Sequence, residues 1–220
     1  MRSTKRPAPS RRPRAADVTT RERLLESAAR TIADRGFRGA TVREICRRAR
    51  ANVAAVNYHF GSRKVLEVEA ARWAASRMPD DPWFESGAGS GDPGTDLRAA
   101  VAAFARRLLG PHEAWQTRFM MRALAEPTPA LDVIVRERIE PKIRALEGVL
   151  ARFLPRADAR TLRLTALSVV AQGAYHRLAS PLALRLLGER SLTEDLAGEI
   201  AAHVAEFTER SLTAAREAAR

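Results

Sequence analysis

The stretch Thr41–Lys64, TVREICRRARANVAAVNYHFGSRK, decides the fold because it predicts two short helices joined by a turn. Thr41 and, three residues later, Glu44 form a capping-box pattern, which marks the start of the first helix. Asn52 is a favourable N-cap for the second helix, which we expect over Val53–His59. The apolar residues of the first helix recur at helical spacing and are Val42, Ile45, Cys46 and Ala49.

The second helix is predicted to have two different sides. Its apolar side carries Val53, Val56 and Phe60, its opposite side carries Ala54, Ala55 and Tyr58, and its flanks carry Asn57 and His59. Alanines allow close approach to a DNA groove, and Asn57 is able to pair bidentately with adenine. This is the layout of a helix-turn-helix, whose second helix enters the major groove. The alternative is that both helices belong to a small core.

Positive charge is concentrated in the same part of the chain. The net charge is +12 over 220 residues, and residues 1–64 hold 17 Lys or Arg against 5 Asp or Glu, whereas residues 65–220 hold 21 of each. Because Lys and Arg contacts to phosphate supply most sequence-independent DNA affinity, this asymmetry favours a nucleic-acid partner. An anionic membrane is disfavoured, since Ala54, Ala55 and Tyr58 give no bulky apolar face.

Other classes of protein are disfavoured by what the sequence lacks. Its single cysteine, Cys46, excludes a disulfide scaffold, and we interpret it as a core residue rather than a redox sensor. We find no apolar run of about 18 residues and no signal-peptide pattern. The four histidines are scattered, and no nucleophile motif is present. We therefore expect a cytoplasmic protein that is not an enzyme and has no metal, cofactor or membrane partner.

Residues before the helix-turn-helix divide into an arm and a helix. Residues 1–18 are rich in Arg, Pro and Ser and predict a disordered basic arm, which either follows DNA phosphates or serves only as a solubilising tail. A helix capped by Thr20 should run to Gly36, and Phe37 should fill the small core. The expected domains are therefore the arm, a three-helix DNA-binding domain at residues 19–64 and a larger helical domain at residues 65–220.

The larger domain is predicted to be entirely helical. A helix capped by Ser62 precedes a loop rich in Pro and Gly at residues 79–95, and a new helix begins at Asp96. Further helices follow, and Pro141 should kink or divide one of them. Thr161–Leu178 is apolar on nearly every side, which predicts that a second subunit covers part of it. The last helix, at about residues 192–215, offers a second apolar stripe of Leu196, Ile200, Val204, Phe207 and Leu212.

Three segments resemble the TetR/AcrR family of bacterial transcriptional regulators, with the CecR-like subgroup as the most similar. They are Gly36-Phe37, Ala40–Ile45 (ATVREI) and Val53–Ser62 (VAAVNYHFGS), and the resemblance covers residues 20–66. It implies an operator-binding N-terminal domain on an all-helical homodimer, whose larger domain binds an inducer. It also implies that the last two helices form a four-helix bundle across a two-fold axis.

The resemblance also implies which residues contact DNA. It places phosphate contacts at Thr41 and Asn52, groove contacts at Ala54, Ala55, Asn57 and Tyr58, and a backbone contact at His59. The basic residue that follows the Phe in the family falls on Arg63. The chain departs from the family at two points. The turn glycine is replaced by Arg50, which either loosens the turn or reaches a phosphate, and the usual Lys is Arg63, with Lys64 beside it.

The candidate ligand pocket lies among the middle helices. Its expected lining combines aromatic, flexible and polar side chains, namely Trp115, Phe119, Met120, Met121, Gln172, Tyr175 and His176. The alternative is ordinary core packing, to which Met and aromatic residues at helical spacing more often belong. The sequence thus predicts a dimeric repressor of a palindromic DNA operator, released by a small apolar or amphipathic inducer. The rival interpretation is a basic helical protein that coats nucleic acid without reading its sequence.

Overall fold

The computed structural model describes residues 15–77, 90–110 and 113–218, and within these ranges the chain forms helices and no strands. The first four helices are α1 (Ala15–Gly39), α2 (Val42–Ala49), α3 (Val53–Phe60) and α4 (Arg63–Ser76). Next come α6 (Pro93–Leu109), α7 (Ala114–Ala125), α8 (Pro129–Ile134), the π-helical turn η1 (Val135–Ile139) and α9 (Glu140–Phe153). The last are α10 (Ala159–Leu178), α11 (Ser180–Leu187) and α12 (Glu194–Ala218). The predicted all-α fold is confirmed.

Helix α1 is longer than the sequence pattern indicates. It begins at Ala15, so Thr20 lies inside it and is not its cap. Residues 15–18 of the predicted arm are therefore helical, and the remainder of the arm lies outside the described residues. Gly36 has the expected positive φ of 75°, which interrupts the helix so that Phe37 turns into the core.

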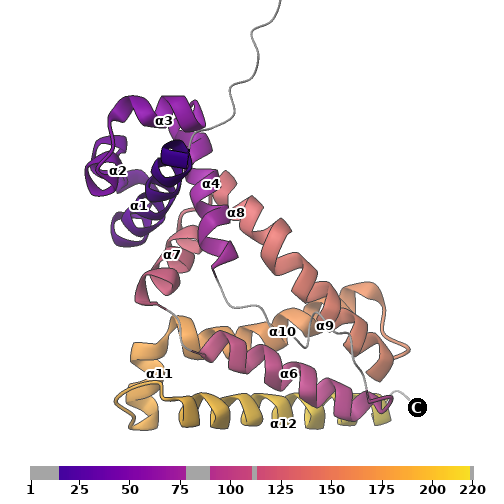
Figure 1. Cartoon of the computed structure of the whole chain (residues 1–220). Helices are drawn as coiled ribbons and strands as arrows, with labels where there is room; N and C mark the ends of the chain where they lie inside the picture. Colours follow the sequence, from indigo (N-terminus) through magenta and orange to yellow (C-terminus); the bar gives the residue numbers. More distant parts are fainter. Residues whose placement is uncertain (1–14, 78–89, 111–112, 219–220) are drawn as a thin grey trace, which may run out of the picture.

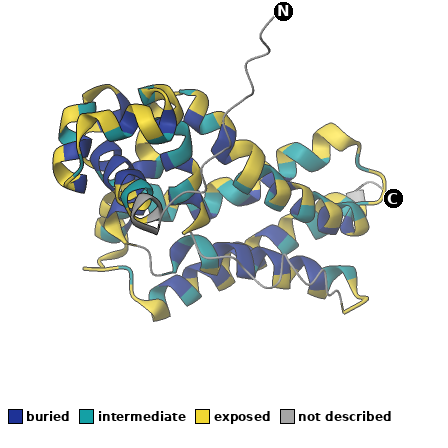
Figure 2. Ribbon diagram, turned by 45° about the horizontal axis from the view of Figure 1, so that its top comes forward, coloured by how far each residue is buried: buried dark blue, intermediate teal, exposed yellow. Residues whose placement is uncertain are grey.

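A first hydrophobic core joins the N-terminal helices to two helices of the larger domain. Leu24, Ile32 and Ile45 are fully buried in it, and Phe119 of α7 and Ile134 of α8 belong to the same cluster. Figure 2 shows the buried residues on the inward sides of these helices. The packing therefore crosses the expected boundary at residue 64.

A second core fills the rest of the molecule. Helix α6 packs along α12 and against α10, as Figure 1 shows in the lower part of the view. Leu97, Leu146, Leu150 and Val204 are buried between these helices and α9. Of the second apolar stripe, all members except Phe207 pack in or against this core, whereas Phe207 is 55% exposed. Most of the stripe on α12 thus packs within the chain, and Phe207 is its exposed member.

A segment interrupted by a π-helical turn connects the two cores. α8 belongs to the first core and α9 to the second, and Ile139 of η1 packs against both. Pro141 lies in the first turn of α9, where its missing N–H group breaks no hydrogen bond of that helix. The predicted interruption at Pro141 is confirmed, and it takes the form of a wider turn just before the proline.

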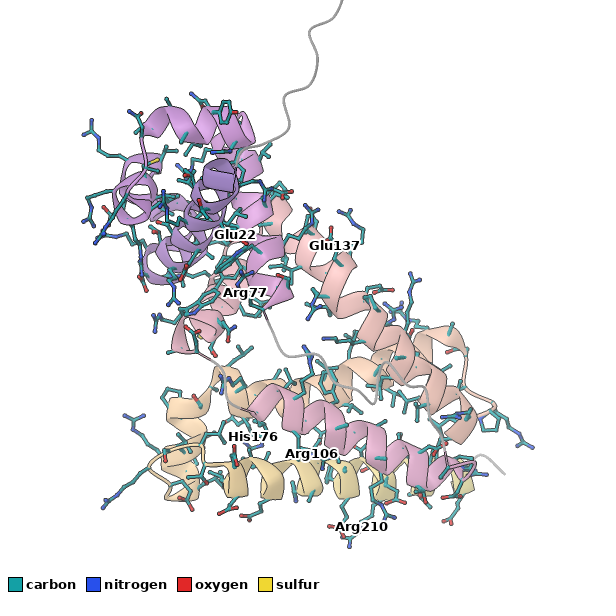
Figure 3. The ribbon with its side chains drawn as sticks, in the orientation of Figure 1. Glu22, Arg77, Arg106, Glu137, His176 and Arg210 are labelled. Carbon is teal, nitrogen blue, oxygen red and sulfur yellow. The ribbon has the colours of Figure 1, made fainter. Side chains whose placement is uncertain are left out.

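Polar and aromatic contacts hold α7 and η1 against α1 and α4. The guanidinium of Arg72 donates two hydrogen bonds of 2.8 Å to the Glu137 carboxylate, and the Gln116 amide donates to the Arg77 carbonyl at 3.1 Å. Figure 3 shows Arg77 and Glu137 along this seam. The Asp34 carboxylate accepts from Arg48 of α2 at 2.9 Å and from Arg118 of α7 at 3.1 Å. The helix-turn-helix is therefore directly connected to the larger domain.

Candidate nucleic-acid interface and ligand cavity

Side-chain caps define both helices of the helix-turn-helix. The Thr41 hydroxyl accepts the Glu44 amide hydrogen at 3.3 Å, and Asn52 Oδ1 accepts from the Ala54 amide at 2.9 Å. The Glu44 carboxylate pairs with Arg47 at 2.7 Å, so the structure shows only the Thr41 half of the expected capping box. Both predicted helix starts are confirmed.

The turn between these helices is closed by a residue in the left-handed conformation. Arg50 has φ 50° and ψ 47°, and it is the one non-glycine residue with positive φ in the described parts of the chain. The Ala51 amide donates to the Cys46 carbonyl at 2.9 Å, which completes a tight helix end. Arg50 therefore adopts the backbone geometry that glycine favours, and the turn is not loosened.

Helix α3 presents one face to solvent at the outer end of the molecule, away from α6 and α12 (Figure 1). Val56 and Phe60 are buried beneath it, whereas Ala54, Asn57 and Tyr58 are exposed, Tyr58 by 73%. Val53, expected on the inner side, is 49% exposed and extends the outer face at the first turn of the helix. Ala55 and His59 are half-buried, and Ala55 packs against the core.

The basic residues around this face differ in how they are held. Arg50 and Lys64 are exposed, and neither forms an ion pair with another described residue. Arg63 donates to the Phe37 carbonyl at 2.5 Å and to Glu67 at 2.7 Å, so its guanidinium is held by its own chain. Thr41 and Asn52 are exposed beside the turn. The predicted DNA-contacting residues thus lie close together, but Arg63 is less available than Arg50 and Lys64.

Cys46 lies under the helix-turn-helix. Its side chain is 2% exposed, and burial raises the pKa of its thiol because the thiolate would lose solvation. The thiol contacts the Asn52 carbonyl at 3.8 Å. Its interpretation as a core residue is confirmed.

A cavity of about 250 Å³ lies between α6, α7, the segment from α8 to α9, and α10. Its wall is mainly apolar and includes Phe104, Leu108, Met120, Leu124, Val170 and Ala174. Four cationic residues also line it, namely Arg107, Arg138, Lys142 and Arg177. An apolar wall with a few polar groups is typical of a small-molecule site, and the volume is slightly below the usual range of about 300–1,000 Å³.

The structure brings only one of the seven predicted pocket residues to this cavity. Met120 lines it, but Trp115 and Phe119 belong to the first core, and Met121 and Tyr175 are each 45% exposed. The Trp115 ring packs against that of Trp73 of α4 in a tilted arrangement, with ring centroids 5.9 Å apart. The prediction was wrong for these side chains because an apolar pattern shows that one side of a helix is buried. It does not show which neighbouring helix or cavity that side meets.

The two other polar candidates also lie off the cavity. The Gln172 amide donates to the Ser168 carbonyl on its own helix at 3.4 Å. His176 is half-buried between α10 and α12 (Figure 3), and burial lowers its pKa, with a smaller contribution from His203. The sequence interpretation also missed all four cavity cations, which come from α6, from the continuous segment η1–α9 and from α10.

Among the described residues, no three or more His, Cys, Asp or Glu side chains are grouped so that they could hold a metal ion. None of the described helices is both long and apolar enough to cross a membrane.

Two family models match the chain. Residues 24–70 match the model for bacterial regulatory proteins of the tetR family. Residues 93–215 match the model for the C-terminal domain of the HTH-type transcriptional dual regulator CecR. Together they cover both the helix-turn-helix and the helices around the cavity.

Individual relatives agree with the family models. The chain is 36% identical over 63 residues to the HTH-type transcriptional repressor AcnR of Corynebacterium efficiens, a match that spans 29% of this chain and 34% of AcnR. A crystal structure of a transcriptional regulator from Rhodococcus sp. Rha1 has a TM-score of 0.60 and 22% identity, over 87% of this chain and 96% of that one. The regulator PfmR of Thermus thermophilus has a TM-score of 0.58 and 20% identity, over 86% and 95%. At these identities the solved structures show the fold alone.

Proposed function

Because the chain belongs to the TetR family of DNA-binding transcriptional regulators, with a C-terminal domain of the CecR type, we propose that it is a repressor that reads a palindromic operator as a homodimer. The observation that carries this proposal is the outer face of α3. Asn57 and Tyr58 are exposed there on a helix whose other side is anchored by Val56 and Phe60. Such a helix is able to enter a major groove without unfolding.

Each residue group of the interface has a distinct role in the proposal. Val53, Ala54, Asn57 and Tyr58 would face base edges, where apolar contacts to thymine methyl groups and bonds to adenine discriminate sequence. Ala55, expected on the same face, packs against the core and would not reach a base. Thr41, Arg50, Asn52, His59 and Lys64 would contact phosphates and fix the register of the helix. Arg63 would act mainly by holding α4 to Phe37, as its hydrogen bonds indicate.

Exposed apolar residues on α10 support the proposed homodimer. Leu164, Leu167 and Tyr175 are 53%, 47% and 45% exposed, and their spacing places them on one stripe of the helix. Phe207 of α12, the neighbouring helix, is also exposed. We propose that the partner subunit covers this surface, so that two copies of α3 face half-sites about 34 Å apart or a multiple of that distance.

The cavity is proposed to hold the inducer. It lies between the two cores, so a ligand that prefers another arrangement of α7 relative to α10 would shift the population of conformations. Helix α7 transmits such a shift to α1 through Phe119, whose ring lies 5.9 Å from that of Phe37. The protein would then release its operator in the cytoplasm.

Groove recognition is tested with a duplex selected by the protein from random sequences and with a scrambled duplex of equal length. Tyr58→Ala should weaken binding to the selected duplex about 10-fold or more, because a good base contact is worth about 1–3 kcal/mol, and should change binding to the scrambled duplex little. Fluorescence anisotropy measures both affinities.

The matched control is Arg11→Ala, in the basic arm outside the described residues. It should weaken both duplexes to a similar, small extent, because phosphate contacts carry no sequence information. Equal losses on both duplexes for Tyr58→Ala would contradict groove recognition by α3 and favour a protein that coats nucleic acid without reading it.

A further inference from the structure

The peptide group between Phe37 and Arg38 is held from two sides by charged side chains. Its carbonyl, on Phe37, accepts a hydrogen bond from Arg63 of α4 at 2.5 Å. Its N–H group, on Arg38, donates to the Glu126 carboxylate at the end of α7 at 3.3 Å. Glu126 lies 88 residues from Arg38 in the sequence. One peptide group of the DNA-binding body therefore contacts both α4 and α7.

The Glu126 carboxylate packs closely on this turn. It lies against Gly36, where an added Cβ would overlap its Oε1 atom. Gly36 has a φ of 75°, so the position favours glycine both for its backbone and for the space that glycine leaves. The Glu126 side chain is 24% exposed, and Arg122, one turn earlier on α7, lies 3.8 Å from it. The carboxylate is thus also held from its own helix.

The position of Glu126 is unfavourable for the helix that carries it. Glu126 is the C-cap residue of α7, and the dipole at the C-terminal end of a helix favours cations over anions. Removing this charge should therefore leave α7 itself no less stable. What the carboxylate stabilises is the contact between α7 and the turn after α1.

This turn determines where the helix-turn-helix lies relative to α7. It leads from α1 into Thr41, the N-cap of α2, and the Phe37 ring within it lies 5.9 Å from the Phe119 ring of α7. In a dimer, the two recognition helices match a palindrome only when their separation equals that of the half-sites. The contact at Arg38 is therefore able to affect this separation without touching DNA.

We infer that Glu126 is a positioning residue for operator recognition, whose hydrogen bond to the Arg38 N–H group fixes the helix-turn-helix on α7 in the arrangement that a palindrome requires. The inference rests on the proposed function, because it takes the protein to read two half-sites as a dimer. Without the carboxylate, each helix-turn-helix keeps its fold and its exposed face. Fewer molecules, however, hold both recognition helices at the required separation.

Glu126→Ala is tested on the selected palindrome and on a duplex of equal length that keeps one half-site and scrambles the other. The variant should bind the palindrome about 10-fold more weakly, since the apparent dissociation constant rises as the fraction of molecules in the binding arrangement falls. Its affinity for the single half-site should be nearly unchanged, because one recognition helix needs no fixed separation from another. Fluorescence anisotropy measures both affinities. Unchanged affinity for the palindrome, or an equal loss on both duplexes, would overturn the inference.

The matched control is Glu147→Ala. It removes a carboxylate of similar exposure, 19%, that joins α9 to Arg163 of α10 in the other half of the molecule. Both affinities should equal those of the wild type. A loss on the palindrome as large as that of Glu126→Ala would show that the effect does not depend on the contact with Arg38, and would count against the inference.

Hydrogen exchange in the free protein separates this inference from the proposed function. NMR follows the Arg38 amide in the absence of DNA, and its exchange should be faster in Glu126→Ala and unchanged in Glu147→Ala. Equal exchange in Glu126→Ala and the wild type would overturn the inference even if the wild type reads a palindrome. A failure of the proposed function has a different signature, which is equal affinity of the wild type for the selected and scrambled duplexes.

Discussion

Among single residues, Arg50 shows how structure and function place opposite demands on one position. Its left-handed backbone costs a non-glycine residue about 1–2 kcal/mol, yet its side chain is exposed at the turn before α3. Retaining an arginine at this strained position is understandable if the side chain contacts a phosphate.

Arg50→Gly should therefore separate the two effects. We expect the free energy of unfolding to rise by about 1 kcal/mol, because glycine adopts this conformation without the steric penalty. Binding to both selected and scrambled duplexes should weaken, because a phosphate contact is lost. Urea unfolding and anisotropy measure the two quantities, and Arg50→Asn, which also tolerates positive φ, serves as a control. A variant that is no more stable and binds DNA as well as the wild type would refute this account of Arg50.

His176 predicts a pH dependence of stability. Burial is the main reason that the pKa of its folded form lies below the usual value, so the unfolded chain takes up a proton first as the pH falls. The free energy of unfolding should decrease as the pH is lowered through about 6.5, the ordinary pKa of histidine, toward the lower folded pKa. The stabilisation is complete above this window.

Denaturant unfolding at several pH values checks this prediction. His176→Gln should flatten the decrease, whereas His203→Gln, at an exposed position on α12, should retain most of it. An unchanged pH profile for His176→Gln would show that another group is responsible.

At the level of helices, α7 is the element that links the cavity to the DNA-binding helices. By sequence it belongs to the larger domain, but its Phe119 side chain is fully buried in the first core. Asp34 binds both Arg48 of α2 and Arg118 of α7, and these arginines lower the pKa of its carboxyl group. α7 therefore forms one wall of the cavity and one face of the DNA-binding body.

Phe119→Ala should test this dual position. Truncating a fully buried phenylalanine costs about 3–5 kcal/mol, and the loss should appear as faster hydrogen exchange in α1, which shares its core. The matched variant Phe153→Ala removes a buried phenylalanine from the second core and should leave exchange in α1 nearly unchanged. Unchanged exchange in α1 for Phe119→Ala would mean that α7 does not support the DNA-binding helices.

The helices could largely be predicted from local signals, whereas their packing could not. Thr41, Asn52, Ser62 and Pro141 mark element boundaries through hydrogen bonds or steric effects that involve only neighbouring residues. Helix α11 was missed, and α6 begins at Pro93 rather than Asp96. The partners of α7 and the four cations of the cavity depend on residues distant in sequence, and an amphipathic pattern shows that a side is buried without showing what covers it.

For the whole molecule, the exposed stripe on α10 predicts the assembly. Leu167→Glu should place a charge in the proposed subunit contact and convert the dimer into a monomer, because an unpaired charge is costly to bury. Met121→Glu, at a similarly exposed apolar position on α7, should leave the dimer intact. Sedimentation equilibrium distinguishes these outcomes, and a Leu167→Glu variant that remains dimeric would locate the contact elsewhere.

The central claim is that α3 reads DNA sequence, and one ratio of affinities tests it most directly. The wild-type protein is titrated, at physiological ionic strength, with the selected palindromic duplex and with a scrambled duplex of the same length and composition. We predict that the selected duplex binds about 1,000-fold or more tightly, the lower end of what specific DNA-binding proteins achieve over non-specific DNA. Equal affinity for the two duplexes would contradict the claim.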